Sequence, residues 1–158
     1  MKRYIKSAFI WAASGAIACL AAPVLANEPK QVIMPEDAEA RTFNEQYGFS
    51  DAVVHGDTVY LAGVMIYREE DESEADAYVR GWVTISAILE KAGSSLDDII
   101  DLTSFHTDQM GQAVVFTEVK NRYIKAPFPT WTAIDIDRIF LDNGIVEIKI
   151  VARLKSSD

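Results

Sequence analysis

The chain has 158 residues, and its 24 acidic residues outnumber its 15 basic ones to give a formal net charge of −9. This balance argues against nucleic-acid binding, because contacts from Lys and Arg to phosphate supply most of that affinity. Cys19 is the only cysteine, so the rest of the chain contains neither a disulfide nor a thiol nucleophile.

The first 26 residues have the pattern of an export signal. A few basic residues near the start precede an almost uncharged apolar run over residues 7–20, and small residues follow up to Ala26. We expect residues 1–26 to be a signal peptide that directs the protein to the periplasm and is then removed. Two alternatives stay open. One is an uncleaved membrane anchor, because the run approaches the ~20 residues of a spanning helix, and the other is lipidation of Cys19.

Removal of this segment leaves residues 27–158, which is enough chain for one domain with a hydrophobic core. Its 12 basic and 24 acidic residues give a net charge of −12. Residues 27–44 are polar and show no period, so we expect an exposed N-terminal lead-in to a single domain over residues 45–158. Packing or oligomerisation has to stabilise this domain, because no disulfide is available.

Period-two patterns bounded by turn residues predict strands, and apolar residues at steps of three and four predict amphipathic helices. An acid-rich loop separates the second strand from the first helix, but it lacks the spacing of a calcium-binding loop. The elements predicted before the C-terminal region are, in chain order, strands over residues 49–54 and 59–66, a helix over 78–92, a strand over 99–107 and a helix over 116–123.

Two further strands are predicted over residues 130–136 and 145–154, around the turn Asp142-Asn143-Gly144. If they pair as a hairpin with aligned apolar faces, Trp131 and Glu147 lie together on the face away from the core. We interpret that face as the functional surface. The full order of elements predicts an α+β fold, with one mixed sheet, two helices on one of its faces and nothing on the other.

Several segments resemble the RidA/YjgF family, the reactive intermediate deaminases. FPTWTAIDI and VEIKIVA are similar to the family's C-terminal signature, and matching motifs lie at residues 56–63, 89–93 and 116–123. The resemblance spans residues 45–154. It implies a chorismate-mutase-like fold that assembles as a homotrimer, with ligand clefts between subunits.

Members of this family hydrolyse enamines and imines derived from amino acids, and release ammonia and a 2-oxo acid. The resemblance implies that an arginine grips the substrate carboxylate and that a glutamate, here Glu147, is the catalytic group that acts with water. The positions that correspond to the family's substrate-binding residues are Phe49, Ala62, Gly63, Lys120, Trp131 and Ala133.

Trp131 stands where the family has its arginine. An indole has one N–H donor and no charge, and loss of a bidentate carboxylate contact removes about 2–5 kcal/mol of binding at a desolvated site. Trp131 is then either an aromatic plug at a subunit interface or a surface on which a ligand stacks. Four other cations are alternatives to the arginine, although we expect each to be a solvated surface charge: Arg80, Lys120, Arg122 and Arg153.

We therefore expect an exported member of the family that binds a small metabolite between subunits and lacks standard 2-imino acid deaminase activity. The alternative is an enamine/imine deaminase, a hydrolase that uses Glu147 and water on a non-standard substrate. We expect no cofactor, and no metal site because His55 and His106 share no ligand spacing. Neither nucleic acid nor, after signal cleavage, a membrane is an expected partner.

Cleavage of the signal can be tested directly. N-terminal sequencing of the mature protein should begin at Asn27, because the pattern of small residues ends at Ala26. A sequence that starts at Met1, or a lipid on Cys19, would contradict a soluble periplasmic protein.

Overall fold

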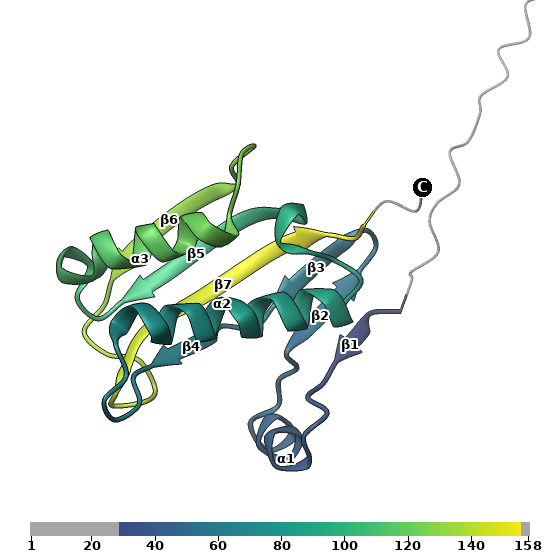
Figure 1. Ribbon diagram of the computed structural model, residues 1–158. Coiled ribbons are helices and arrows are strands. Elements are labelled where there is room, and N and C mark those ends of the chain that lie inside the picture. Colours follow the sequence, from purple (N-terminus) through teal and green to yellow (C-terminus); the bar gives the residue numbers. More distant parts are fainter. Residues whose placement is uncertain (1–28, 156–158) are drawn as a thin grey trace, which may run out of the picture.

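The computed structural model describes residues 29–155, so the predicted signal peptide and Cys19 lie outside the described residues. The elements are β1 Gln31–Ile33, α1 Ala38–Tyr47, β2 Ala52–His55, β3 Thr58–Leu61, β4 Val64–Tyr67, α2 Glu74–Lys91, the short 3-10 helix Leu96–Asp98, β5 Ile99–His106, α3 Gln109–Tyr123, β6 Thr130–Asp135 and β7 Gly144–Arg153. The strands form one mixed sheet in the order β1-β2-β3-β7-β5-β6, and β4 also pairs with β7. Helices α2 and α3 lie side by side on one face of this sheet (Figure 1).

Strand β7 is central to the sheet, because it pairs antiparallel with β3, β4 and β5. Buried and more exposed side chains alternate along it, as the period-two pattern predicted. Val146, Ile148, Ile150 and Ala152 are almost completely buried in the core between the sheet and the helices. The alternate residues, Glu147 among them, therefore point to the opposite face.

Helix α2 has the predicted amphipathic pattern, and the side chains of its apolar stripe form much of the core. Its N-terminus is capped by Ser73, whose hydroxyl accepts a hydrogen bond of 3.1 Å from the backbone N–H of Asp76. Gly81 faces Ile66 of β4 so closely that a Cβ at this position would overlap the isoleucine side chain. Glycine thus allows the helix to approach the sheet. The fully buried residues of the stripe are Tyr78, Trp82, Ile85 and Leu89.

Helix α3 begins after Asp108, whose carboxylate accepts a hydrogen bond of 3.0 Å from the backbone N–H of Gly111. Its buried residues are of mixed character: Phe116 and Val119 are apolar, whereas Gln112 and Lys120 are polar. The helix therefore places two polar side chains against the sheet.

No element of residues 29–155 covers the second face of the sheet. Val32 of β1, Tyr60 of β3 and Ile134 of β6 lie on this open face. Each leaves between 39% and 47% of its surface exposed. The predicted fold class is confirmed, with one addition. Helix α1 is a third helix, which was not predicted, and it lies beyond the end of the sheet rather than on its covered face (Figure 1).

The predicted hairpin of the last two strands is wrong. Strand β6 pairs in parallel with β5, and β5 in turn pairs antiparallel with β7, so β5 separates β6 from β7. The physical reason is that α3 connects β5 to β6 as a crossover, which returns the chain to the same end of the sheet and makes the two strands parallel. Neighbours in sequence are therefore not neighbours in the sheet.

Two other boundaries differ from the prediction. The segment over residues 59–66 is two strands, β3 and β4, which pair with different parts of β7 on either side of Ala62 and Gly63. The lead-in predicted for residues 27–44 contains β1 and most of α1, and most of its described side chains are exposed. Within residues 29–155, none of the helices combines the length and hydropathy that crossing a membrane requires.

A chain of buried polar groups lies between β5, β6 and α3. His106 Nε2 is 2.9 Å from Ser104 Oγ, and His106 Nδ1 is 3.0 Å from Gln112 Oε1. The indole N–H of Trp131 donates to Ser104 Oγ at 2.9 Å, and the amide of Gln112 donates to Thr107 Oγ1 at 3.3 Å. One arrangement of protons satisfies all of these groups. His106 is neutral with its proton on Nδ1, which donates to Gln112 Oε1, and its Nε2 accepts from the Ser104 hydroxyl.

Burial lowers the pKa of His106 below its ordinary value, and this effect outweighs the hydrogen bond that the ring donates to Gln112 and the nearby charges of Asp135 and Glu74, which act in the opposite direction. Protonation would also remove the acceptor at Nε2 that holds the Ser104 hydroxyl. The polar chain is therefore stable only with a neutral ring.

Stability should consequently decrease in mild acid. The unfolded chain gains the proton of His106 at about pH 6.5, above the pKa of the folded protein, so the free energy of unfolding falls as the pH drops below that value. The expected slope is at most about 1.4 kcal/mol per pH unit. Urea unfolding between about pH 7.5 and 5.5 should show this slope in the wild type and in the control variant His55→Gln, which changes an exposed residue at the end of β2. The slope should be absent in His106→Gln. An equal slope in all three proteins would contradict the assignment.

Candidate functional site

The sheet register places Trp131 and Glu147 on opposite faces. Trp131 pairs with Leu102, which pairs with the buried Ile150, so the indole is on the face that the helices cover. Glu147 pairs with Phe105 and, on its other side, with Met65, so its side chain is on the open face. The prediction that the two residues share one face is therefore wrong, and the cause is the strand β5 that separates β6 from β7.

Trp131 is held from two sides at the edge of the covered face. Its N–H donates to Ser104, as described above, and its ring lies 5.9 Å from the ring of Phe116. Lys120 Nζ lies 4.5 Å from the centre of the Trp131 ring, a cation–π contact. The tryptophan remains 41% exposed. Its single donor is in use, so it offers a ligand a ring surface and no hydrogen bond.

Lys120 is buried, and the prediction of a solvated surface charge is wrong for this residue. Only 7% of its surface is exposed, and its ammonium donates a hydrogen bond of 2.9 Å to Asn121 Oδ1. No carboxylate among residues 29–155 forms an ion pair with it. Burial lowers its pKa. The side chain is buried because Lys120 lies on the side of α3 that faces the ring of Trp131.

Lys120 and Trp131 line a pocket with a volume of about 300 Å³. This volume is at the lower end of the range for small-molecule sites, which is roughly 300–1,000 Å³. The other residues of the wall come from β5, α3 and the segment before β6: Leu102, Thr117, Asn121, Ile124, Phe128 and Pro129. We call this the Lys120 pocket. Ala133 pairs with Ser104 two residues beyond Trp131 along β6, so it also lies on the covered face.

The remaining predicted residues lie elsewhere. Ala62 and Gly63 connect β3 to β4, and a Cβ on Gly63 would overlap the carboxylate of Glu147, so this side chain lies against the glycine backbone. Glu147 has neither a hydrogen bond nor an ion pair to its side chain within the described part of the chain. Phe49 is exposed and belongs to an aromatic cluster with Phe43, which lies 6.1 Å away.

The predicted site is thus divided between two groups. The covered-face group is Lys120, Trp131 and Ala133, and the open-face group is Ala62, Gly63 and Glu147. A single chain brings the residues of each group together but does not bring the two groups to one cavity. The sequence also gave no role to Ser104, which positions Trp131; its place two residues before His106, on the same buried strand face, is a signal that could have identified it.

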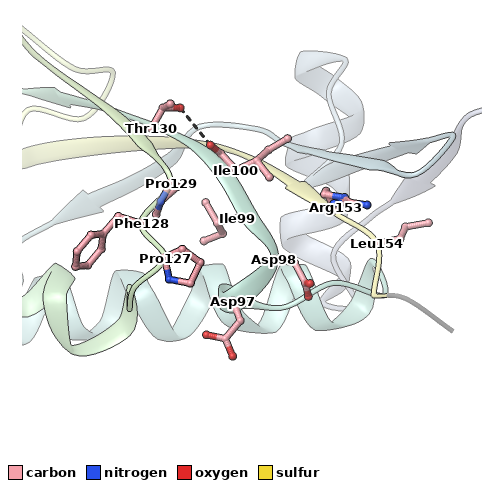
Figure 2. A pocket seen from close by; sticks show the side chains of 10 residues that line it. All are labelled: Asp97, Asp98, Ile99, Ile100, Pro127, Phe128, Pro129, Thr130, Arg153 and Leu154. Carbon is pink, nitrogen blue, oxygen red and sulfur yellow. Dashed lines mark hydrogen bonds between the residues drawn. The ribbon is translucent and has the colours of Figure 1, made fainter. Parts of the chain in front are cut away.

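A second pocket, of about 420 Å³, lies between the start of β5, the end of β7 and residues 127–130 (Figure 2). Asp97, Asp98 and Arg153 contribute its charged groups. Thr130 donates a hydrogen bond of 3.1 Å to the carbonyl of Ile100 at its upper wall (Figure 2). None of the predicted site residues lines this pocket, but it borders the Lys120 pocket, because Phe128 and Pro129 line both.

The other three candidate cations have surroundings that do not involve Trp131. Arg80 forms a 2.9 Å ion pair with Glu72, and its guanidinium lies 4.6 Å from the centre of the Tyr67 ring. The hydrogen bond from Arg80 holds the pKa of Glu72 below its ordinary value. Arg122 is exposed and Arg153 lines the second pocket. Residues 29–155 also contain no group of three His, Cys, Asp or Glu side chains that could hold a metal ion.

Comparisons with known proteins agree with this fold. The model of the family described as Endoribonuclease L-PSP matches residues 40–154. The RutC family protein YjgH of Escherichia coli K12 is 37% identical over 113 residues, which are 69% of this chain and 85% of the relative.

Solved structures give the same result. The structure of Protein YJGH has a TM-score of 0.68 and 28% identity, and the match covers 81% of this chain and 98% of the other. RidA from the Antarctic bacterium Psychrobacter sp. PAMC 21119 has a TM-score of 0.61 and 28% identity, with 67% and 88% covered. NMB1025 from Neisseria meningitidis, a member of the YjgF family, has a TM-score of 0.69 at 19% identity, with 84% and 100% covered. The chain therefore belongs to the RidA/YjgF family.

Proposed function

We propose that this protein is an exported member of the family that binds a small metabolite in clefts between the subunits of a homotrimer, without standard 2-imino acid deaminase activity. The observation that carries the proposal is the state of Trp131, at the position of the family's arginine. Its only donor is committed to Ser104, so it supplies neither a charge nor a free N–H to a substrate carboxylate. An imino acid would lack the contact that orients it for attack by water.

The separation of the covered-face group from the open-face group within one chain supports a homotrimer. The covered-face group lies at β6, an edge strand of the sheet, while the open-face group lies at the break between β3 and β4. A ligand can contact both groups only if the open face of one subunit meets the β6 edge of the next. The apolar side chains of the open face favour such contact, because burial of Tyr60 and Ile134 removes apolar surface from water.

The covered-face group determines the kind of ligand. Its pocket has walls of Leu102, Ile124 and Phe128, and the ring of Trp131 forms a flat surface. Such a pocket favours a small molecule with an apolar or aromatic body. Export from the cytoplasm would place this binding activity in the periplasm.

A deaminase is the second candidate, and one observation favours it. Glu147 is not paired with a cation among the described residues, and its carboxylate lies against the backbone of Gly63. A carboxylate in this state can accept a proton from water and direct the water to an electrophilic carbon. The substrate would be an imine or enamine that does not depend on an arginine.

The trimer can be tested by sedimentation equilibrium. The mature protein should have about three times the mass of its subunit, because contacts between copies cover the open face. Tyr60→Glu places a charge in that face and should shift the equilibrium to smaller species. Val83→Glu is the matched control, because Val83 is exposed on the outer side of α2. A wild-type monomer at micromolar concentration would remove the intersubunit cleft from the proposal.

The missing arginine can be tested by turnover. Freshly generated 2-iminopropanoate should disappear little faster with the wild type than in buffer, as measured by semicarbazone formation. Trp131→Arg should raise kcat/KM by about tenfold or more, which corresponds to about 1.4 kcal/mol or more. Trp131→Phe is the control, because it also loses the hydrogen bond to Ser104 but adds no charge.

The opposite result would identify the second candidate. Rapid hydrolysis by the wild type that Glu147→Ala abolishes would mean that a different cation or a different substrate pose replaces the arginine. The protein would then be a deaminase, and the binding proposal would be wrong.

A further inference from the structure

Lys120 has an environment that no other cation of the described residues shares. It is the only Lys, Arg, Asp or Glu of residues 29–155 that is buried. Its ammonium contacts the face of the Trp131 ring and one amide oxygen, from Asn121, and has no carboxylate partner in this part of the chain. A buried ammonium without a counter-charge is costly, because neither contact replaces the water that the charge loses.

Burial without a counter-charge raises the free energy of the charged ammonium only. A neutral amine in the same place keeps its hydrogen bond to Asn121 and its packing on Trp131, and requires no counter-charge. The neutral amine has a lone pair and is a nucleophile, whereas the ammonium is not. The environment therefore favours the reactive form of the side chain.

The Lys120 pocket gives this amine a place to react. It has about 300 Å³ of free volume and opens to the surface, and apolar or aromatic groups form most of its wall. We propose that Lys120 is a carbonyl-binding lysine, whose amine forms a covalent imine with small apolar aldehydes or ketones that enter this pocket. The reaction goes beyond the proposed metabolite binding, and every residue that it needs belongs to one chain.

The reaction balances without any other reagent. The lone pair of Lys120 Nζ attacks the carbonyl carbon, a C–N bond forms, and a proton moves from nitrogen to oxygen to give a carbinolamine. Loss of the hydroxyl group with the second proton of the nitrogen releases one water and leaves a C=N bond. If the imine gains a proton from solvent, its positive charge lies above the ring of Trp131, which already attracts the ammonium at 4.5 Å.

The experiment uses reductive trapping on the mature protein. Benzaldehyde and sodium cyanoborohydride at neutral pH reduce each imine to a stable benzylamine, and peptide mass spectrometry measures the rate at each lysine. Lys120 should be labelled about tenfold faster or more than Lys125, an exposed lysine near the same end of α3. A carbonyl too large for the pocket, pyrene-carboxaldehyde, should show no preference for Lys120.

Two variants make the result specific. Lys120→Arg keeps the positive charge but cannot form an imine under these conditions, so the fast phase of labelling should disappear. Lys125→Arg is the matched control and should keep it. Near-ultraviolet circular dichroism verifies that both variants fold.

Labelling at Lys120 that is equal to or slower than labelling at Lys125 would overturn the inference, as would a fast phase that persists in Lys120→Arg. Neither result concerns the hydrolysis of imino acids, which the semicarbazone assay measures independently. Failure of the carbonyl reaction and failure of the proposed binding function are therefore distinguishable.

Discussion

Parallel pairing between β5 and β6 determines where the side chains of the site lie. Because β6 returns beside β5 and not beside β7, Trp131 faces the helices and Glu147 faces the open side. The same crossover carries α3 over the end of β6 and places Lys120 on the indole ring. The parallel pairing of β5 and β6 thus separates the two groups of the predicted site, and it brings Lys120 and Trp131 of the covered-face group together in one pocket.

Within that pocket, Trp131 and Lys120 depend on each other. The hydrogen bond to Ser104 fixes the edge of the indole, and the ring then offers its face to an ammonium that has no carboxylate partner among residues 29–155. Ser104 is itself oriented by His106, so a neutral histidine in the core supports the position of a surface aromatic. Trp131 therefore belongs to one set of contacts that joins β5, β6 and α3.

Elements with a regular apolar period could be predicted from the sequence. Alternation along β7 and the apolar stripe of α2 predicted which side chains enter the core. The hairpin failed because alternation gives the two faces of a strand but not the identity of its neighbour. The burial of Lys120 could not be predicted, because α3 has no continuous apolar stripe: glutamine and lysine occupy buried positions beside Phe116. The short β1 and the polar α1 were not predicted, because three residues are too few for an alternating pattern and Asn44 is the only residue of α1 that is buried.

The contact between Gly63 and Glu147 has an evolutionary consequence. The backbone of Gly63 is not in the left-handed region that only glycine adopts easily, so a side chain at this position is opposed by the Glu147 carboxylate as it is placed here and not by torsion angles. Substitutions at the two positions are therefore not independent. Alanine or serine at position 63 becomes compatible with the fold once a shorter residue replaces Glu147, and a lineage that has lost the carboxylate can accumulate larger residues at 63. A larger residue at 63 in turn fills the space that the carboxylate occupies, so it disfavours the return of the glutamate.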